Sequence, residues 1–291
     1  MTTAATDHAI VQAACTQAGL DSSTATPLHR HATSVWLLRD RGVVVRIDHS
    51  ANQRRAELAV TVTRWLLEQG FPAIEPLAVD QPVAIDGAVV TFWRYYPQNN
   101  RAAPGAGALG ALLRRLHELP QPPVQLDDYV PLAHLGRALE SDLSLPDEDR
   151  TWLANRRLQL LTAYGPLDSA LGVGFIHGDA YPGNTLWDGQ FVRLGDWDEV
   201  ARGPRELDLV NTHQGARFGR SAEERQAFTD AYGWDVTTWP GYPILREMRD
   251  LHTLGAFSER AARGDDVAVA ELRRRVATLR AGDANSRWHA S

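Results

Sequence analysis

The densest group of polar residues in an apolar setting is the loop within FIHGDAYPGNTLW, residues 175–187. It contains His177, Asp179 and Asn184, and Asp196 follows twelve residues after Asn184, behind another strand-like run. We expect Asp179, Asn184 and Asp196 to meet at one end of a small hairpin. Carboxylate and amide oxygens suit Mg²⁺, which keeps several waters and usually shares its coordination with substrate phosphates. The spacing therefore favours a magnesium site that handles phosphates, with His177 fixing the loop.

The same residues leave a second chemistry open. His177, Asp179, Asp196 and Asp198 would also suit the metal of a hydrolase that releases phosphate from a phosphoester. The spacing of Asn184 speaks against this alternative.

The residues before this loop must supply a sheet. The predicted helices and strands of the first ~95 residues are a short helix over 5–19, strands over 33–39 and 42–48, a helix over 50–69 with Ser50 as its N-cap, and strands over 77–85 and 88–95 joined by Asp86-Gly87. They form a small antiparallel sheet with one long helix.

After Pro97 helical periodicity dominates. The predicted helices are 109–119, 132–143, 147–164, 222–232, 244–263 and 265–281, and short strands are predicted at 173–176, 185–187 and 191–194. The fold class is therefore α+β, with a β-rich lobe over residues 1–96, a helical lobe over 97–291 and a cleft between them.

The composition of the chain limits the classes of partner and the compartment that we expect. The 291 residues carry a formal net charge of −6, which argues against a nucleic-acid partner because phosphate contacts need a clustered basic surface, and favours a cationic one. Cys15 is the single cysteine, which favours a reducing compartment. Neither a signal peptide nor a transmembrane helix is recognisable, so we expect a cytoplasmic protein without a membrane partner. All 30 basic residues are arginine, because the chain has no lysine.

The pattern His177-x-Asp179-x4-Asn184 followed by Asp196-Trp197-Asp198 resembles the aminoglycoside phosphotransferase family, relatives of the protein kinases. The segments LLRRLH at 112–117 and RGPRELDL at 202–209 agree with that family. The resemblance covers roughly residues 30–260. It implies a protein-kinase-like fold, with nucleotide bound by the first lobe and the catalytic loop and acceptor site in the second.

The resemblance also implies roles for individual residues. Asp179 matches the catalytic aspartate, which orients the acceptor hydroxyl and accepts its proton, and His177 supports it. Asn184 and Asp196 match the two Mg²⁺ ligands, and Asp198 is expected to help the metal or to face a cationic acceptor. Metal-held phosphates and positioned groups are sufficient for phosphoryl transfer.

Further positions follow from the same resemblance. Asp208 matches an aspartate that supports the catalytic loop, and His117 is expected to be a satisfied core histidine. Tyr95 and Tyr96 would lie on the connector between the lobes, where the family's backbone groups hydrogen-bond a purine.

The chain departs from the family at two donor-site positions. Arg46 stands where the family has a strand lysine that grips the phosphates, and Glu57, eleven residues further on, is its expected ion-pair partner. The loop 29–34, which ends at Ser34, has no glycine where kinases have a glycine-rich cover. Its small side chains would let backbone amides approach the phosphates.

These observations predict a small-molecule kinase. It would transfer the γ-phosphoryl of ATP or GTP, with Mg²⁺, to a hydroxyl of a small acceptor, preferably a cationic antibiotic or metabolite, and would act as a monomer or homodimer. The alternative from another class is a catalytically silent relative that binds nucleotide as a sensor or scaffold.

Overall fold

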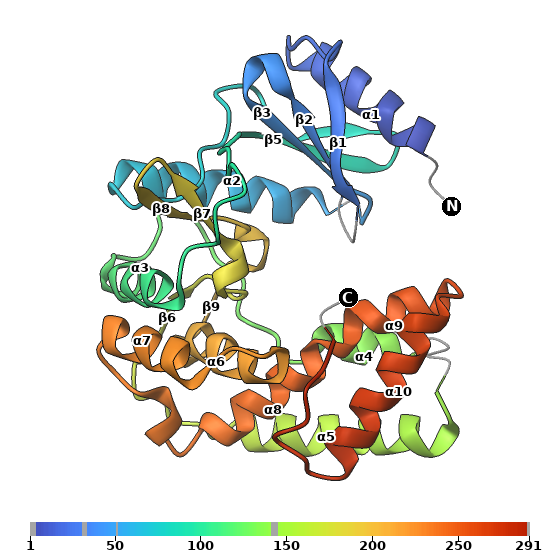
Figure 1. Ribbon diagram of the computed structural model, residues 1–291, viewed down its shortest axis with the longest axis vertical. Helices are drawn as coiled ribbons and strands as arrows, with labels where there is room; N and C mark the ends of the chain where they lie inside the picture. Colours follow the sequence, from blue (N-terminus) through green and yellow to red (C-terminus); the bar gives the residue numbers. More distant parts are fainter. Residues whose placement is uncertain (1–3, 31–33, 51, 141–144, 290–291) are drawn as a thin grey trace. The chain divides into compact units, whose positions relative to one another are not determined.

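The computed structural model describes residues 4–30, 34–50, 52–140 and 145–289 (Figure 1). Its contacts divide the chain into two compact units. The first unit consists of Met1–Pro104, Glu118–Leu126 and Pro182–Val200, and the second of Gly105–His117, Asp127–Tyr181 and Ala201–Ser291. A small antiparallel sheet and a largely helical region are both present, as the sequence predicts.

The described helices and strands have the following bounds. The helices are α1 (Ala4–Gln17), α2 (Gln53–Glu68), α3 (Ala106–Glu118), α4 (Ala133–Leu139), α5 (Asp147–Tyr164), α6 (Glu206–Gln214), α7 (Ala222–Tyr232), α8 (Tyr242–His252), α9 (Leu254–Ala262) and α10 (Asp266–Arg280). The strands are β1 (Ala25–Arg30), β2 (Ser34–Leu38), β3 (Val43–Asp48), β4 (Val83–Ile85), β5 (Ala88–Arg94), β6 (Val173–Ile176), β7 (Thr185–Asp188), β8 (Phe191–Leu194) and β9 (Ala201–Pro204). None of these helices is long and apolar enough to span a bilayer.

The sheet of the first unit has the order β1-β2-β3-β5-β4, with antiparallel pairing throughout. In β3, Val43, Val45 and Ile47 are buried, and they belong to a core that includes Val11 and Cys15 of α1. Because side chains alternate between the faces of a strand, Arg46 lies on the face away from α1. Burial raises the pKa of the Cys15 thiol to about 11, so this cysteine stays protonated.

Helix α2 begins later than predicted. Ser50 does not cap it, because its amide and hydroxyl both donate to the carboxylate of Asp48, at 2.8 and 2.7 Å. Asn52 is the N-cap, and its side chain accepts from the amide of Arg55 at 3.1 Å. Serine and asparagine both favour N-cap positions, but Ser50 is already hydrogen-bonded within the short turn to Asp48.

One strand prediction and one loop prediction also need correction. The predicted strand 77–85 is reduced to β4, since the side chain of Gln81 occupies the amide of Phe92 at 2.8 Å where a neighbouring strand would pair. The predicted loop 29–34 is partly sheet: His29 and Arg30 end β1 and Ser34 begins β2. Residues 31–33 of that loop lie outside the described residues, and so do residues 141–143 of the predicted helix 132–143.

In the second unit the helices follow the prediction with one split and one omission. The predicted helix 244–263 is divided into α8 and α9 at Thr253, whose hydroxyl donates to the carbonyl of Asp250 at 2.7 Å. Helix α6 and strand β9 were not predicted. Strand β9 pairs antiparallel with β6, the strand that leads into His177.

Candidate active site

Arg46 of β3 is engaged by two acids of the first unit. Its Nη2 lies 2.8 Å from Asp198 Oδ2 and 3.1 Å from Asp196 Oδ1. Burial lowers the pKa of Arg46, but the charges of Asp198 and Asp196 outweigh it and the net direction is upward. The guanidinium is therefore a permanent cation at this place.

The expected ion pair between Arg46 and Glu57 is wrong. Glu57 is exposed, and its carboxylate accepts a hydrogen bond from Gln53 at 2.7 Å. Arg55 is the α2 residue that reaches the acidic turn: its Nε donates to the carbonyl of Asp198 at 2.8 Å and its Nη2 pairs with Glu199. Sequence reasoning missed Arg55 because a family pattern directs attention to an acid on this helix.

The hairpin β7–β8 brings Asn184 and Asp196 to the same end. Thr185 pairs with Leu194, and the amide of Gly195 donates to the carbonyl of Asn184 at 2.8 Å. Asp196 has φ +62°, a conformation that few non-glycine residues adopt and that often marks functional sites. The Asn184 amide and the partly exposed Asp196 carboxylate both line one cavity, and oxygen donors of these kinds fit Mg²⁺ with waters and phosphates as its other ligands.

A cavity of about 450 Å³ lies beside these residues in the first unit. Its lining combines apolar side chains with Arg46, Asn184 and Asp196, and it includes Tyr95 and Tyr96. A volume of this order accommodates a small ligand or a nucleotide. Its remaining lining residues are Leu28, Val35, Val44, Ile74, Trp93, Arg94, Gln98, Gly183, Leu186 and Gly195.

The two connector tyrosines have defined partners. The amide of Tyr95 donates to Gly42 at 2.8 Å, and the carbonyl of Tyr96 accepts from the side chain of Gln98 at 2.7 Å. Burial raises the pKa of the Tyr96 hydroxyl to about 12. Ser34 does not line the cavity, because its hydroxyl donates to Asp7 of α1 at 2.7 Å.

The catalytic-loop candidates lie in the second unit. His177 is fully buried, and its Nδ1 accepts from the amide of Asp179 at 3.3 Å, which makes it a loop anchor. The Oδ1 atom of Asp179 receives two donors, Nη2 of Arg249 at 2.5 Å and Nδ2 of Asn211 at 3.2 Å. Arg249 lies on α8 and Asn211 on α6, so the local sequence spacing around Asp179 does not predict either contact.

Asp208 fixes the same loop from α6, as the resemblance implies. Its carboxylate, fully buried, accepts from the amides of His177 and Gly178, both at 2.8 Å, and contacts His117 Nε2 at 3.1 Å. Burial raises the pKa of Asp208, but the hydrogen bond and charge of His117, followed by His177, outweigh it and hold the pKa low. Gly178 has φ +83°, which glycine adopts without a steric penalty. His117 is a satisfied histidine, since Nδ1 also contacts the Tyr232 hydroxyl at 2.9 Å.

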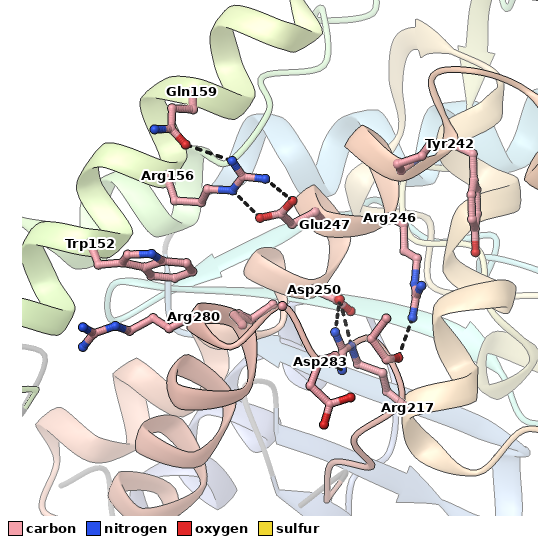
Figure 2. Close-up of a pocket in the computed structure, with 14 residues that line it drawn as sticks. Trp152, Arg156, Gln159, Arg217, Tyr242, Arg246, Glu247, Asp250, Arg280 and Asp283 are labelled. Carbon is pink, nitrogen blue, oxygen red and sulfur yellow. Dashed lines mark hydrogen bonds and ion pairs between the residues drawn. The ribbon is translucent and has the colours of Figure 1, made fainter.

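A second cavity, of about 460 Å³, lies within the second unit between α5, α8 and the segment that follows α10 (Figure 2). Arg156 and Glu247 form an ion pair across it, and Arg217 pairs with Asp250 at 2.7 Å. Asp283 lies at its exposed rim, and its carboxylate accepts from two backbone amides. Asp250, which lines this cavity, directly follows Arg249 in α8.

Solved structures share this fold. The amicoumacin kinase hAmiN, in complex with AMP-PNP, Ca²⁺ and Ami, aligns with a TM-score of 0.72 and 14% identity over 97% of this chain and 96% of its own. A choline/ethanolamine kinase family protein from Mesorhizobium loti aligns at 0.64 and 21% identity, over 95% and 94%. An aminoglycoside phosphotransferase from Streptomyces rimosus aligns at 0.61 and 18%, over 85% and 99%. The chain therefore has the fold of the kinase-like small-molecule phosphotransferases.

The sequence agrees with this class. The model of the phosphotransferase enzyme family matches residues 24–248, so the chain belongs to that family. The members of this family are phosphotransferases. No curated protein matches the sequence.

Proposed function

We propose that the chain transfers the γ-phosphoryl of ATP or GTP, with Mg²⁺, to a hydroxyl of a small acceptor. The observation that carries the proposal is the convergence of Arg46, Asn184 and Asp196 on one cavity of nucleotide size. The similar amicoumacin kinase binds an ATP analogue, which supports a nucleotide donor. The base of the nucleotide would occupy the apolar end of this cavity, and its phosphates the end with Arg46.

Asn184 and Asp196 would hold the metal, and Arg46 would bind phosphate oxygens through its planar guanidinium. Bound Mg²⁺ would neutralise charge on the phosphates. Asp198 is less suited to the metal than the sequence suggests, because it contacts Arg46 through both carboxylate oxygens, at 2.8 and 3.5 Å.

Asp179 would act as the base that orients the acceptor hydroxyl and accepts its proton. Its carboxylate is partly exposed and is held at Oδ1 by Arg249 and Asn211. His177 would act through the backbone, since its ring accepts from the amide of Asp179. This geometry favours the kinase over the hydrolase alternative, because the buried ring of His177 serves the loop itself.

The cavity in Figure 2 is our candidate for the acceptor site. Helix α8 lines it with Asp250 and, at the preceding residue, sends Arg249 to Asp179. Among the described residues, four arginines and three acids line the cavity. Because Glu247 and Asp250 are neutralised by arginines, Asp283 is the one of these acids that we assign to a cationic group of the acceptor. The acidic balance of the chain favours such a cation.

An acceptor screen tests the proposed function. Purified protein with ATP or GTP and Mg²⁺ is offered aminoglycosides, cyclic peptides, nucleosides and amino alcohols, and release of ADP or GDP is measured together with the phosphorylated product. We expect product with at least one hydroxyl compound, none with Asp179→Asn, and a raised KM for a cationic acceptor in Asp283→Asn. Phosphate release from simple phosphoesters without nucleotide would favour the hydrolase instead.

A further inference from the structure

The contacts of Arg46 define an ion pair that differs from the one expected. Its two terminal nitrogens face the two carboxylate oxygens of Asp198, at 2.8 and 3.5 Å. The side chains of Arg46 and Asp198 are 17% and 25% exposed, so solvent screens the pair only in part. A two-point contact of this kind fixes the plane of the guanidinium as well as its position.

Helix α2 offers Arg46 no acid. Arg55, Ala56 and Ala59 line a small hollow of about 20 Å³ together with Arg46 and Asp198. Glu57 follows Arg55 by two residues, which is about 200° around the helix, so it must lie on the far side. Its exposure and its hydrogen bond with Gln53 agree with that position.

The same acidic turn also holds α2. Arg55 donates to the carbonyl of Asp198 at 2.8 Å and pairs with the side chain of Glu199. The turn Trp197–Glu199 thus receives one arginine from β3 and one from α2. The expected ion pair between Arg46 and Glu57 would have joined β3 directly to α2. Instead, both elements are joined to this turn.

We propose that Asp198 is the positioning residue for Arg46, in place of an acid on α2, and that Arg55 couples α2 to the same turn. Asp198 would hold the guanidinium plane at the phosphate end of the donor cavity, and Arg55 would make this arrangement depend on α2. The inference rests on the proposed function, because it assigns the residue that prepares the donor site for phosphates.

Nucleotide binding by isothermal titration calorimetry tests this role with a matched pair of charge-removing variants. We expect Asp198→Asn to weaken ATP or GTP binding about tenfold, the effect of losing a charged hydrogen bond, and Glu57→Gln to leave it unchanged. The titration is repeated without Mg²⁺ in the presence of chelator. A positioning role predicts that the loss persists without metal, whereas a metal ligand would lose affinity only when Mg²⁺ is present.

A rescue variant separates positioning from a general loss of structure. Ala56 faces the hollow beside Arg46, so Ala56→Glu in the Asp198→Asn background returns an acid to Arg46 from the α2 side. We expect it to recover most of the lost affinity, with thermal unfolding of all variants measured without ligand. Should Asp198→Asn fail to fold, Glu57→Gln and Arg46→Gln still decide, since only Arg46→Gln should then weaken binding.

The outcomes are distinguishable. Equal affinity of the wild type and Asp198→Asn, an equal loss in Glu57→Gln, or a loss confined to Mg²⁺ would overturn the role of Asp198 and leave the proposed function standing. Failure of the wild type to bind either nucleotide at millimolar concentration would overturn the proposed function, and this inference with it.

Discussion

Asp179 is the residue on which the proposed chemistry depends most. Asp179→Asn keeps the shape of the side chain and removes its ability to accept a proton. We expect kcat to fall by about 10²–10⁴-fold, the usual contribution of a general base, while the nucleotide Kd changes little. Single-turnover kinetics and calorimetry check the two quantities. Turnover that survived this substitution would rule out Asp179 as the base, whereas a wild type without turnover and a cellular role that survives the substitution would favour the silent sensor or scaffold.

Arg249 on α8 supports Asp179 through a hydrogen bond from its guanidinium. Arg249→Met keeps the aliphatic stem and removes the donor to Asp179 Oδ1. We expect kcat to fall by about one to two orders of magnitude, because the base loses its fixed orientation, with the nucleotide KM unchanged.

Arg260 provides the control for this prediction, since it also pairs with an acid, Asp265, at 2.8 Å and is partly exposed (34%, against 18% for Arg249). Arg260→Met should leave kcat as in the wild type. A fall in kcat in both variants would mean that loss of an arginine, rather than loss of the contact with Asp179, causes the effect.

At the scale of elements, Asp208 joins α6 to the catalytic loop. Asp208→Asn replaces a buried carboxylate that accepts two backbone amides and faces His117. An amide has one acceptor oxygen instead of two, so we expect the free energy of unfolding to drop by about 2–4 kcal/mol. Denaturant unfolding measures it. The exposed acid Asp230 on α7 gives the control, since Asp230→Asn should change stability by less than about 0.5 kcal/mol.

The sequence predicted correctly those helices and strands that have a clear pattern within their own residues. Residues Asp147–Tyr164, Ala222–Tyr232 and Val173–Ile176 have the bounds that periodicity gave them. Strand β9 was missed because Gly203 and Pro204 weaken its strand signal. Helix α6 was missed because most of its residues are buried, polar ones included, which removes the amphipathic pattern.

The candidate site also contains residues that local spacing predicts and residues that it does not predict. The catalytic loop and the hairpin hold residues within a short stretch of chain, and their spacing was sufficient to predict that Asn184 and Asp196 lie at one end of the hairpin. Arg55 and Arg249 lie far along the chain from the residues that they contact. The contacts of Arg55 and Arg249 depend on tertiary packing, and no periodicity or spacing in a single sequence predicts such packing.

The stability of the whole molecule should depend on pH through His213. This side chain is buried, and burial lowers its pKa to about 4, with smaller effects of Asp235 and Arg225. Because the unfolded state binds the proton first, stability is complete above about pH 6.5 and is lost as the pH falls toward 4, by up to about 3 kcal/mol. Urea unfolding between pH 7 and 4.5 should show this loss, and His213→Gln should reduce its slope. An unchanged slope would show that other groups dominate.

Binding of a nucleotide together with Mg²⁺ can be measured by thermal unfolding with ATP or GTP, each with and without Mg²⁺, in the wild type and in Asp196→Ala. A ligand that binds only the folded state raises the transition temperature by mass action. We predict a rise with at least one nucleotide that is larger with Mg²⁺, and no added rise from Mg²⁺ in Asp196→Ala. The absence of any rise with either nucleotide at millimolar concentration would show that the chain has no nucleotide site.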